Sequence, residues 1–310
     1  MLLRGVVYQQ RHRRLLIAAA ALVGCAPGVV DAGPTDDAPA EPGATGAGVV
    51  IDAPARAPRC AAGEYYLGNV TGALRDESER PLPAAWVTVC GTSCVAGSTA
   101  ADGTFNVAVN SCIGASSEYA HGAALSFDGL GDRLDLFVDI NPQGIPVMGT
   151  VRFARPLYAP SLLRGGVARP GANPNAAVTM VDGLGFALRY VPATVTYPFG
   201  AEEGVVRAVR LAINQLPPYQ GAPPMVAYAI SPAGAELSAA ARVEFPNVMA
   251  LPPRTTVDIV AVGNHSSYGR PPVGVLERVD VGYVSDDGRR IIAANGLRFF
   301  GTVGYRAVAR

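Results

Sequence analysis

The chain has 310 residues, with 25 basic and 25 acidic side chains, so its formal net charge is zero. Charged residues make up only 16% and hydrophobic residues 49%, while glycine and proline number 36 and 26, a composition typical of β-rich proteins with many turns. Arg4, Arg11, Arg13 and Arg14 all precede the first acid, Asp31, so the rest of the chain is mildly acidic. With no basic stripe to displace counterions from phosphates, nucleic acid is excluded as an expected partner.

The first predicted element is an export signal over residues 1–24. The basic stretch RHRR is followed by LLIAAAALVG, whose ten residues are half of the roughly 20 that a membrane-spanning helix needs. The tetrapeptide LVGC, residues 22–25, then resembles the lipobox of bacterial lipoproteins. This resemblance implies cleavage after residue 24, acylation of Cys25, and an exported protein anchored in membrane lipid at the outer membrane or cell surface.

Two other fates of the N-terminus stay open. Cleavage after Ala32 would release a soluble protein, and an uncleaved signal would be a plain membrane anchor. In either case residues 25–59 are rich in Pro, Gly, Ala and Asp and contain no aromatic residue. Such a segment has too little apolar bulk to form a core, so it is predicted to be a disordered tether.

A first β-sandwich is predicted over residues 60–150. Short alternating runs separated by turn residues indicate strands at 65–74, 84–89, 94–100 and 103–109. The stretch from about 64 to 140 resembles the carboxypeptidase regulatory-like domain, in which metal binding and catalysis belong to a different domain. The resemblance rests on turn and core positions: Gly68, Val70, Gly72, Asp76, Pro81, Leu82, Ala84, Val87, Val89, Thr99, Asp102, Gly103 and Phe105.

The cysteine count predicts disulfides in this domain. With Cys25 assigned to lipid, Cys60, Cys90, Cys94 and Cys112 remain, an even set in a chain expected to be exported. Three pairings are possible, and we favour Cys90–Cys94 across a tight hairpin together with Cys60–Cys112. A four-cysteine zinc site is the alternative, although the Cys-x3-Cys spacing is loose for one.

Acidic residues follow the last of these cysteines. Asp128, Asp132 and Asp135, with Asp139 close behind, could supply oxygen ligands to Ca²⁺. Their spacing does not match an EF-hand, and alternation with Leu and Phe also indicates a turn followed by a half-exposed strand. The candidate metal ligands are therefore weighed against an ordinary strand.

A second β-sandwich is predicted over residues 151–310, because β-branched runs recur about every ten to fifteen residues. The segment ISPAGAELSAAARVEFPN, residues 230–247, resembles the closing part of ZU5-type sandwich domains. Residues 279–291 predict a hairpin with its turn at Asp286, Asp287 and Gly288. The expected fold class is thus all-β, with two tandem antiparallel sandwiches of Ig-like or prealbumin-like type.

No catalytic constellation is found. His121 and His265 lie in no paired metal-ligand motif, and the loop GNHSSYG places His265 beside two serines, where neighbouring residues rarely face one another as a triad requires. No cofactor motif is present either. We therefore expect a non-enzymatic surface lipoprotein that binds envelope protein or polysaccharide, or serves the envelope structurally; an exported hydrolase and a Ca²⁺-dependent adhesin are the alternatives.

Overall fold

The structure is a computed structural model that describes residues 49–52, 54, 56, 58–114, 124–128, 130–140, 147–197, 204–219, 221–263 and 274–308. The chain divides into two units, Met1–Glu41 and Pro42–Arg310, and all described residues belong to the second. The prediction of an all-β fold is confirmed, since the helices among these residues are single 3-10 turns: η1 (Leu162–Arg164), η2 (Pro192–Thr194) and η3 (Ile213–Gln215). None of the helices described is long and apolar enough to cross a membrane.

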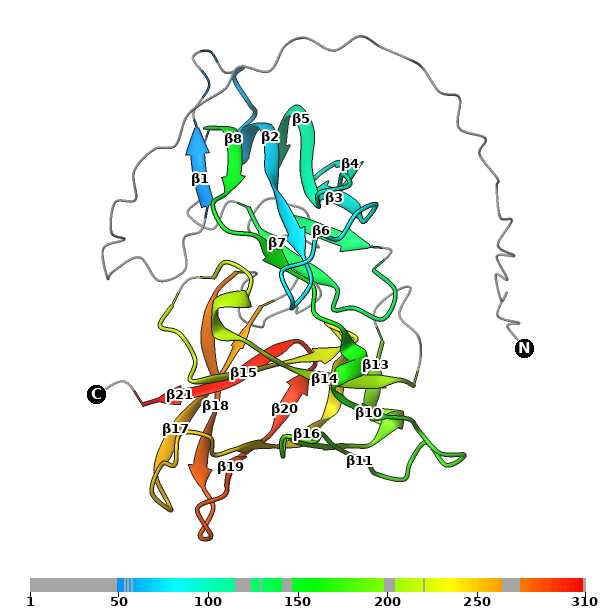
Figure 1. The fold of residues 1–310 in the computed structure, drawn as a ribbon, viewed down its shortest axis with the longest axis vertical. Helices are drawn as coiled ribbons and strands as arrows, with labels where there is room; N and C mark the ends of the chain where they lie inside the picture. The colour runs from blue at the N-terminus through cyan, green and yellow to red at the C-terminus, as the bar shows by residue number, and fades with distance from the viewer. Residues whose placement is uncertain are drawn as a thin grey trace, which may run out of the picture. The chain divides into compact units, whose positions relative to one another are not determined.

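The N-terminal half of this unit is a two-sheet sandwich (Figure 1). One sheet has the strand order β1-β8-β2-β5, with β9 paired to β2, and the other has the order β4-β3-β6-β7. The strands are β1 (Val49–Asp52), β2 (Glu64–Arg75), β3 (Trp86–Cys90), β4 (Cys94–Ser98), β5 (Thr104–Gly114), β6 (Ala124–Asp128), β7 (Leu136–Asp139), β8 (Val147–Phe153) and β9 (Leu157–Tyr158).

Alternating apolar residues of both sheets build the core between them. Val70 on β2 and Val87 on β3 are fully buried in it. Phe105 on β5 meets Phe127 on β6 edge to face, with ring centroids 5.4 Å apart. Each such side chain stabilises the fold by about 1.5–3 kcal/mol relative to its exposed state.

Two of the predicted domain boundaries need correction. Strand β8 runs across residue 150, where the two sandwiches were divided, and belongs entirely to the first sandwich. Strand β1 lies inside residues 25–59, which were predicted as tether, and pairs with β8 from Val49↔Phe153 to Asp52↔Thr150. The apolar residues Val49, Val50 and Ile51 are enough to extend the sheet once β8 offers a free edge.

The expectation of purely antiparallel pairing is also wrong at β2, which pairs in parallel with both β8 and β9. A parallel pair requires a crossover, and here the chain passes through the whole second sheet before it returns beside β2. The two strands approach closely at Gly68, where a Cβ atom would lie 2.2 Å from the carbonyl oxygen of Gly149. Only glycine fits that position.

The C-terminal half is a single sheet of twelve strands with the order β10-β14-β15-β21-β17-β18-β19-β16-β12-β11, to which β13 and β20 add by pairing with β16. Its first strands are β10 (Gly166–Ala168), β11 (Val178–Val181), β12 (Ala187–Tyr190), β13 (Val195–Thr196), β14 (Val206–Leu211) and β15 (Val226–Ser231). The others are β16 (Glu236–Pro246), β17 (Thr256–Val262), β18 (Leu276–Val284), β19 (Arg290–Ala293), β20 (Leu297–Phe299) and β21 (Thr302–Ala307).

This sheet curls around its own core until its two edge strands nearly meet. A Cβ atom on Gly166 of β10 would lie 2.9 Å from Cγ of Met180 on β11. The second domain, predicted as a sandwich, is therefore one nearly closed sheet. Tyr228 stacks on Phe186 inside it, with centroids 4.3 Å apart.

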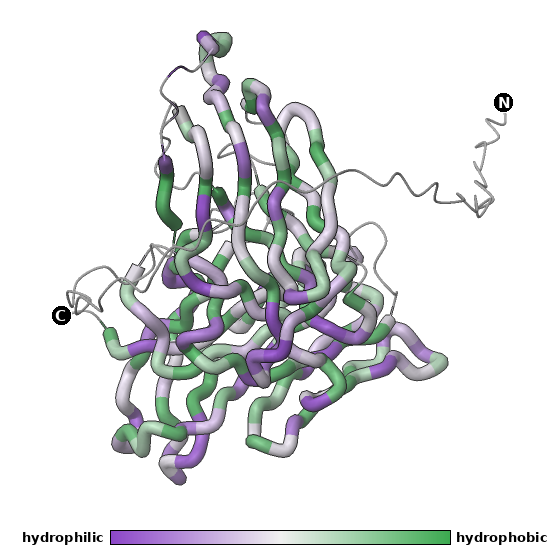
Figure 2. Tube along the Cα trace, turned by 45° about the horizontal axis from the view of Figure 1, so that its top comes forward, coloured by the Kyte–Doolittle hydropathy of each residue, from purple (hydrophilic) through white to green (hydrophobic). Residues whose placement is uncertain are grey.

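The two halves share one apolar layer. Val226, Tyr228 and Ile230 of β15 point into the core of the curled sheet, whereas Ala227 and Ala229 pack in the core of the first sandwich. Strand β15 is therefore buried on both faces, which explains its uninterrupted apolar sequence VAYAI. Elsewhere hydrophobic and hydrophilic colours alternate over short distances along the chain (Figure 2).

Candidate functional site

The four cysteines that were predicted to pair in the first sandwich form two disulfides. Cys60 is bonded to Cys112 and Cys90 to Cys94, with S–S distances of 2.02 and 2.04 Å. This is the pairing that the sequence favours, and it commits the thiols of the alternative zinc site to each other. Cys25, the predicted lipid attachment point, lies outside the described residues.

The calcium candidates lie on three separate elements or loops. Asp128 ends β6, and its side chain is outside the described part. Asp132 is exposed, and its carboxylate lies 3.8 Å from the guanidinium of Arg207. Asp135 is exposed just before β7. Within the described ranges, no three His, Cys, Asp or Glu residues come together as a metal site would need.

We expect thermal unfolding to be unchanged by 5 mM CaCl₂ or by EDTA. A site saturated at 100 times its Kd would stabilise the fold by about 2.7 kcal/mol. In a domain of this size such a gain would raise Tm by roughly 5 °C or more. Differential scanning calorimetry with each additive would show the shift, and a rise in Tm that Mg²⁺ does not reproduce would instead support a calcium site.

The β2–β3 turn is organised around Asp76, whose side chain is 1% exposed. Its Oδ1 accepts hydrogen bonds from the backbone N–H groups of Ser78 (2.8 Å) and Arg80 (3.0 Å), and its Oδ2 accepts one from Nε of Arg80 (2.7 Å). This is the local bonding that makes aspartate a favoured turn residue. Burial opposes ionisation, but the hydrogen bonds outweigh it and lower the pKa of Asp76.

The next residue, Glu77, connects the turn to the start of the C-terminal half. Its Oε2 accepts from the backbone N–H of Ser161 (3.1 Å) and from Nη1 of Arg133 (3.2 Å), and its Oε1 lies 3.1 Å from Nε of Arg164. Its backbone carbonyl accepts from Nε2 of Gln215 (3.2 Å). Burial again opposes ionisation, but hydrogen bonds and the two arginines lower the pKa of Glu77.

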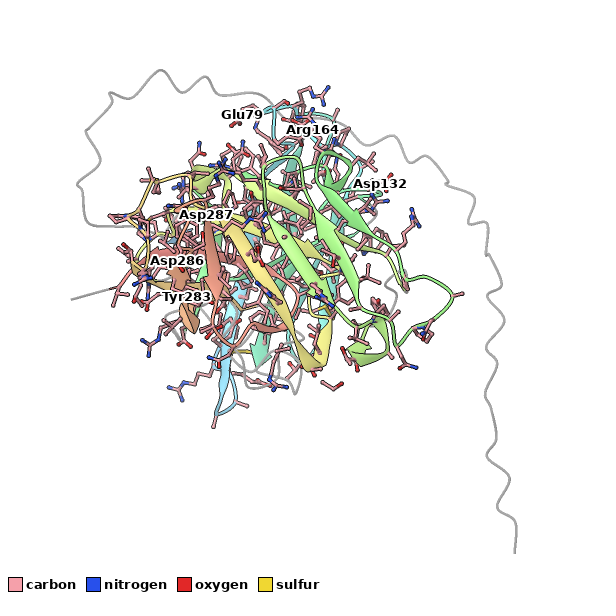
Figure 3. All side chains as sticks on the ribbon, turned by 90° about the horizontal axis from the view of Figure 1, so that it is seen from below. Glu79, Asp132, Arg164, Tyr283, Asp286 and Asp287 are labelled. Carbon is pink, nitrogen blue, oxygen red and sulfur yellow. A yellow bond between two sulfur atoms is a disulfide. The ribbon has the colours of Figure 1, made fainter. Side chains whose placement is uncertain are left out.

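A cleft of about 410 Å³ opens beside this turn. Its size falls within the range of small-molecule sites. Arg164 and Glu79 are labelled in Figure 3; Glu79 belongs to the same turn as Glu77, with which Arg164 pairs. The cleft is lined by Glu77, Pro160, Ser161, Arg164, Gly165, Asp182, Gly183, Leu184, Val209, Arg210 and Gln215.

The polar groups of the cleft are suited to binding. Asp182 Oδ1 accepts from the backbone N–H groups of Leu184 (2.9 Å) and Phe186 (2.8 Å), and Ser161 Oγ accepts from that of Leu163 (3.3 Å). The Asp182 carboxylate and the Ser161 hydroxyl, like the Glu77 carboxylate, therefore already have hydrogen-bond partners within the protein. The guanidinium groups of Arg164 and Arg210, both on exposed residues, can offer donors to a polar or anionic ligand.

The sequence carries no local signal for this cleft. Residues 76–81 are typical of a turn, but nothing in their spacing shows that Arg164, Asp182 and Gln215 would gather beside it. The residues weighed for catalysis, His121, His265 and the neighbouring serines, lie outside the described residues.

The described part of the chain is thus an all-β, disulfide-bonded scaffold with a polar cleft. No protein-family model matches the chain, and a search of curated proteins finds no match. Among solved structures, the Bacillus anthracis TIE protein aligns at 12% identity with a TM-score of 0.22, over 79% of this chain and 49% of that one. This chain therefore spans about half the length of that structure.

Proposed function

We propose that this chain is a lipid-anchored, non-enzymatic surface lipoprotein whose β-scaffold is a binding or structural module of a bacterial envelope. The proposal is supported by the tetrapeptide LVGC, which would place a diacylglyceryl group on Cys25. The disulfides support it as well, because such bonds persist in oxidising compartments outside the cytoplasm. The carboxypeptidase regulatory-like and ZU5-like assignments of the two halves remain predictions.

The observation that supports a binding role is that both carboxylates of the cleft are held in place by hydrogen bonds and ion pairs. Glu77 is held by two arginines and a backbone N–H, and Asp182 by two backbone N–H groups. A general acid or base needs a pKa near the working pH, and the lowered pKa of Glu77 moves away from it. Rigid, charged and solvent-open, the cleft suits recognition of a polar ligand.

Lipidation is tested by labelling cells that express the chain with radioactive palmitate. We expect label on the wild-type protein and none on Cys25→Ser, because only the Cys25 thiol can accept the diacylglyceryl group. The matched control is Ala32→Arg, which blocks the rival cleavage site and should leave labelling intact.

The same samples distinguish the rival fates of the N-terminus. Mass spectrometry of the mature chain should give an acylated peptide beginning at Cys25. An unlabelled mature protein that begins after Ala32 would contradict the proposal and identify a secreted soluble protein.

A further inference from the structure

Trp86 is the only tryptophan of the chain, and it is 54% exposed. It begins β3, an inner strand of the sheet β4-β3-β6-β7, so its indole lies on a sheet face and not on a loop tip. Its neighbours Val87 and Val89 are buried in the core, with Val87 directed inward where Trp86 is directed outward. The tryptophan side chain is thus exposed to solvent on a sheet face, where its ring is accessible to a ligand.

Small polar side chains flank Trp86 on β4, and Asp128 of β6 lies opposite it on the other side. Ser98 on β4 lies directly opposite Trp86, and on the same face Thr88 lies opposite Ala96 on one side and Ser126 on the other. The hydroxyl groups of Thr88, Ser98 and Ser126 have no hydrogen-bond partner among the described residues. We call these five residues the Trp86 platform: Trp86, Thr88, Ala96, Ser98 and Ser126.

The platform is rigid. Strand β3 is hydrogen-bonded on both sides, to β4 from Trp86↔Ser98 to Cys90↔Cys94 and to β6 from Trp86↔Asp128 to Cys90↔Ala124. The Cys90–Cys94 disulfide closes the β3–β4 hairpin at its far end. A preorganised surface loses little conformational entropy when a ligand binds.

The dimensions of the platform limit what it can bind. Three strands spaced about 4.8 Å apart and two outward residues per strand cover roughly 10 Å by 7 Å. A stable protein–protein interface needs about 800 Å² on each partner, several times this area. One or two sugar rings match it.

We propose that the Trp86 platform binds a neutral polysaccharide. The C–H face of a pyranose ring packs on the electron-rich face of the indole. Ring hydroxyls then exchange hydrogen bonds with Thr88, Ser98 and Ser126, which can both donate and accept. The side chains of the platform are uncharged, and the adjoining register position on β6 is Asp128, whose negative charge disfavours an anionic glycan and so favours an uncharged one.

The proposal rests on the proposed surface location only for the source of the glycan. Binding itself requires neither the lipid nor Cys25, so a soluble chain beginning at residue 42 reports on the platform whatever the palmitate experiment shows. Residues 42–310 form one compact unit, which makes this fragment suitable.

The test is a titration of tryptophan fluorescence with cellohexaose, maltohexaose, chitohexaose and mannohexaose. Because Trp86 is the sole tryptophan, its emission reports directly on the platform. With at least one of these sugars we expect a blue shift, protection from acrylamide quenching and saturation. Isothermal titration calorimetry with that sugar should show affinity falling about tenfold or more in Trp86→Ala.

Two further variants test whether sugar binding takes place at the Trp86 platform or elsewhere on the protein surface. Ser98→Arg keeps the indole but covers it, and should abolish the fluorescence change. Tyr283→Ala removes another exposed aromatic, on β18 beside the hairpin that carries Asp286 and Asp287 (Figure 3), and should bind like the wild type.

The proposal is overturned if none of the four sugars alters emission or quenching, or if the affinity survives Trp86→Ala. It is also overturned if emission changes only with protein concentration, since the platform would then be a contact between copies of this chain.

Discussion

Replacing Asp76 with alanine is expected to lower the free energy of unfolding by about 3 kcal/mol at pH 7, because hydrogen bonds to a charged group contribute about 1.5–3 kcal/mol each and their loss is only partly relieved by water. Asp76 is almost completely buried, and its carboxylate accepts the backbone N–H groups of Ser78 and Arg80. Without it these donors lose their partner. The turn that positions Glu77 beside Ser161 and Arg164 then loses its fixed geometry.

The effect should depend on pH in one direction. The pKa of Asp76 is lowered in the folded state, so its stabilisation is complete above the unfolded pKa, near 3.8, and is lost as the pH falls through the folded value. Urea denaturation of the wild type and of Asp76→Ala should therefore give midpoints that differ clearly at pH 7. The two midpoints should converge as the pH is lowered below about 3.8.

The control for this experiment is Asp102→Ala in the β4–β5 turn. Asp102 also accepts a backbone N–H, that of Thr104 at 3.0 Å, but it does so in solvent. Asp102→Ala should therefore lower the free energy of unfolding much less than Asp76→Ala does. Equal losses from the two variants would show that Asp76 is an ordinary turn residue and that Glu77 is positioned by other contacts.

Most strands were predictable because their side chains alternate between water and core. Strand β5 alternates exposed and buried residues from Thr104 to Val109, and the alternation predicted it. Strand β14 carries charges that would also suit a helix, but its valines favour a strand, which is what it forms. In each case the local pattern and the tertiary environment require the same structure.

The missed features depend on partners distant in the chain. Strand β1 is four residues inside a Pro- and Gly-rich stretch, and only its pairing with β8, about 100 residues later, makes it a strand. The double burial of β15 was visible as an apolar run, but the sequence could not say that its second face packs in the first sandwich. The cleft was missed for the same reason, since Glu77 and Gln215 are separated by 138 residues.

The Trp86 platform could have been found in part. A lone tryptophan at the start of a predicted strand is visible in the sequence, but its direction depends on register. A shift of one residue would bury Trp86 and expose Val87. The register is set by the pairing of Trp86 with Ser98 and by the hairpin of Cys90 and Cys94, which the sequence suggests without fixing.

The two disulfides are expected to contribute unequally to stability. Cys60 and Cys112 are separated by 52 residues, whereas Cys90 and Cys94 are separated by four. In the chain-entropy model a cross-link restricts the unfolded chain more when it closes a longer loop. The model gives about 4 kcal/mol for the first disulfide and about 2 kcal/mol for the second.

The double variants Cys60→Ala/Cys112→Ala and Cys90→Ala/Cys94→Ala test this in the 42–310 fragment by urea denaturation without reductant. We expect the first to lose about twice as much free energy of unfolding as the second. Cys112 lies on β5 opposite Tyr66 of β2, so the first disulfide also secures the entry of the chain into a central strand pair. If instead the Cys90–Cys94 variant loses more, native-state constraint of the hairpin outweighs loop entropy, and that disulfide stabilises chiefly the strands beneath Trp86.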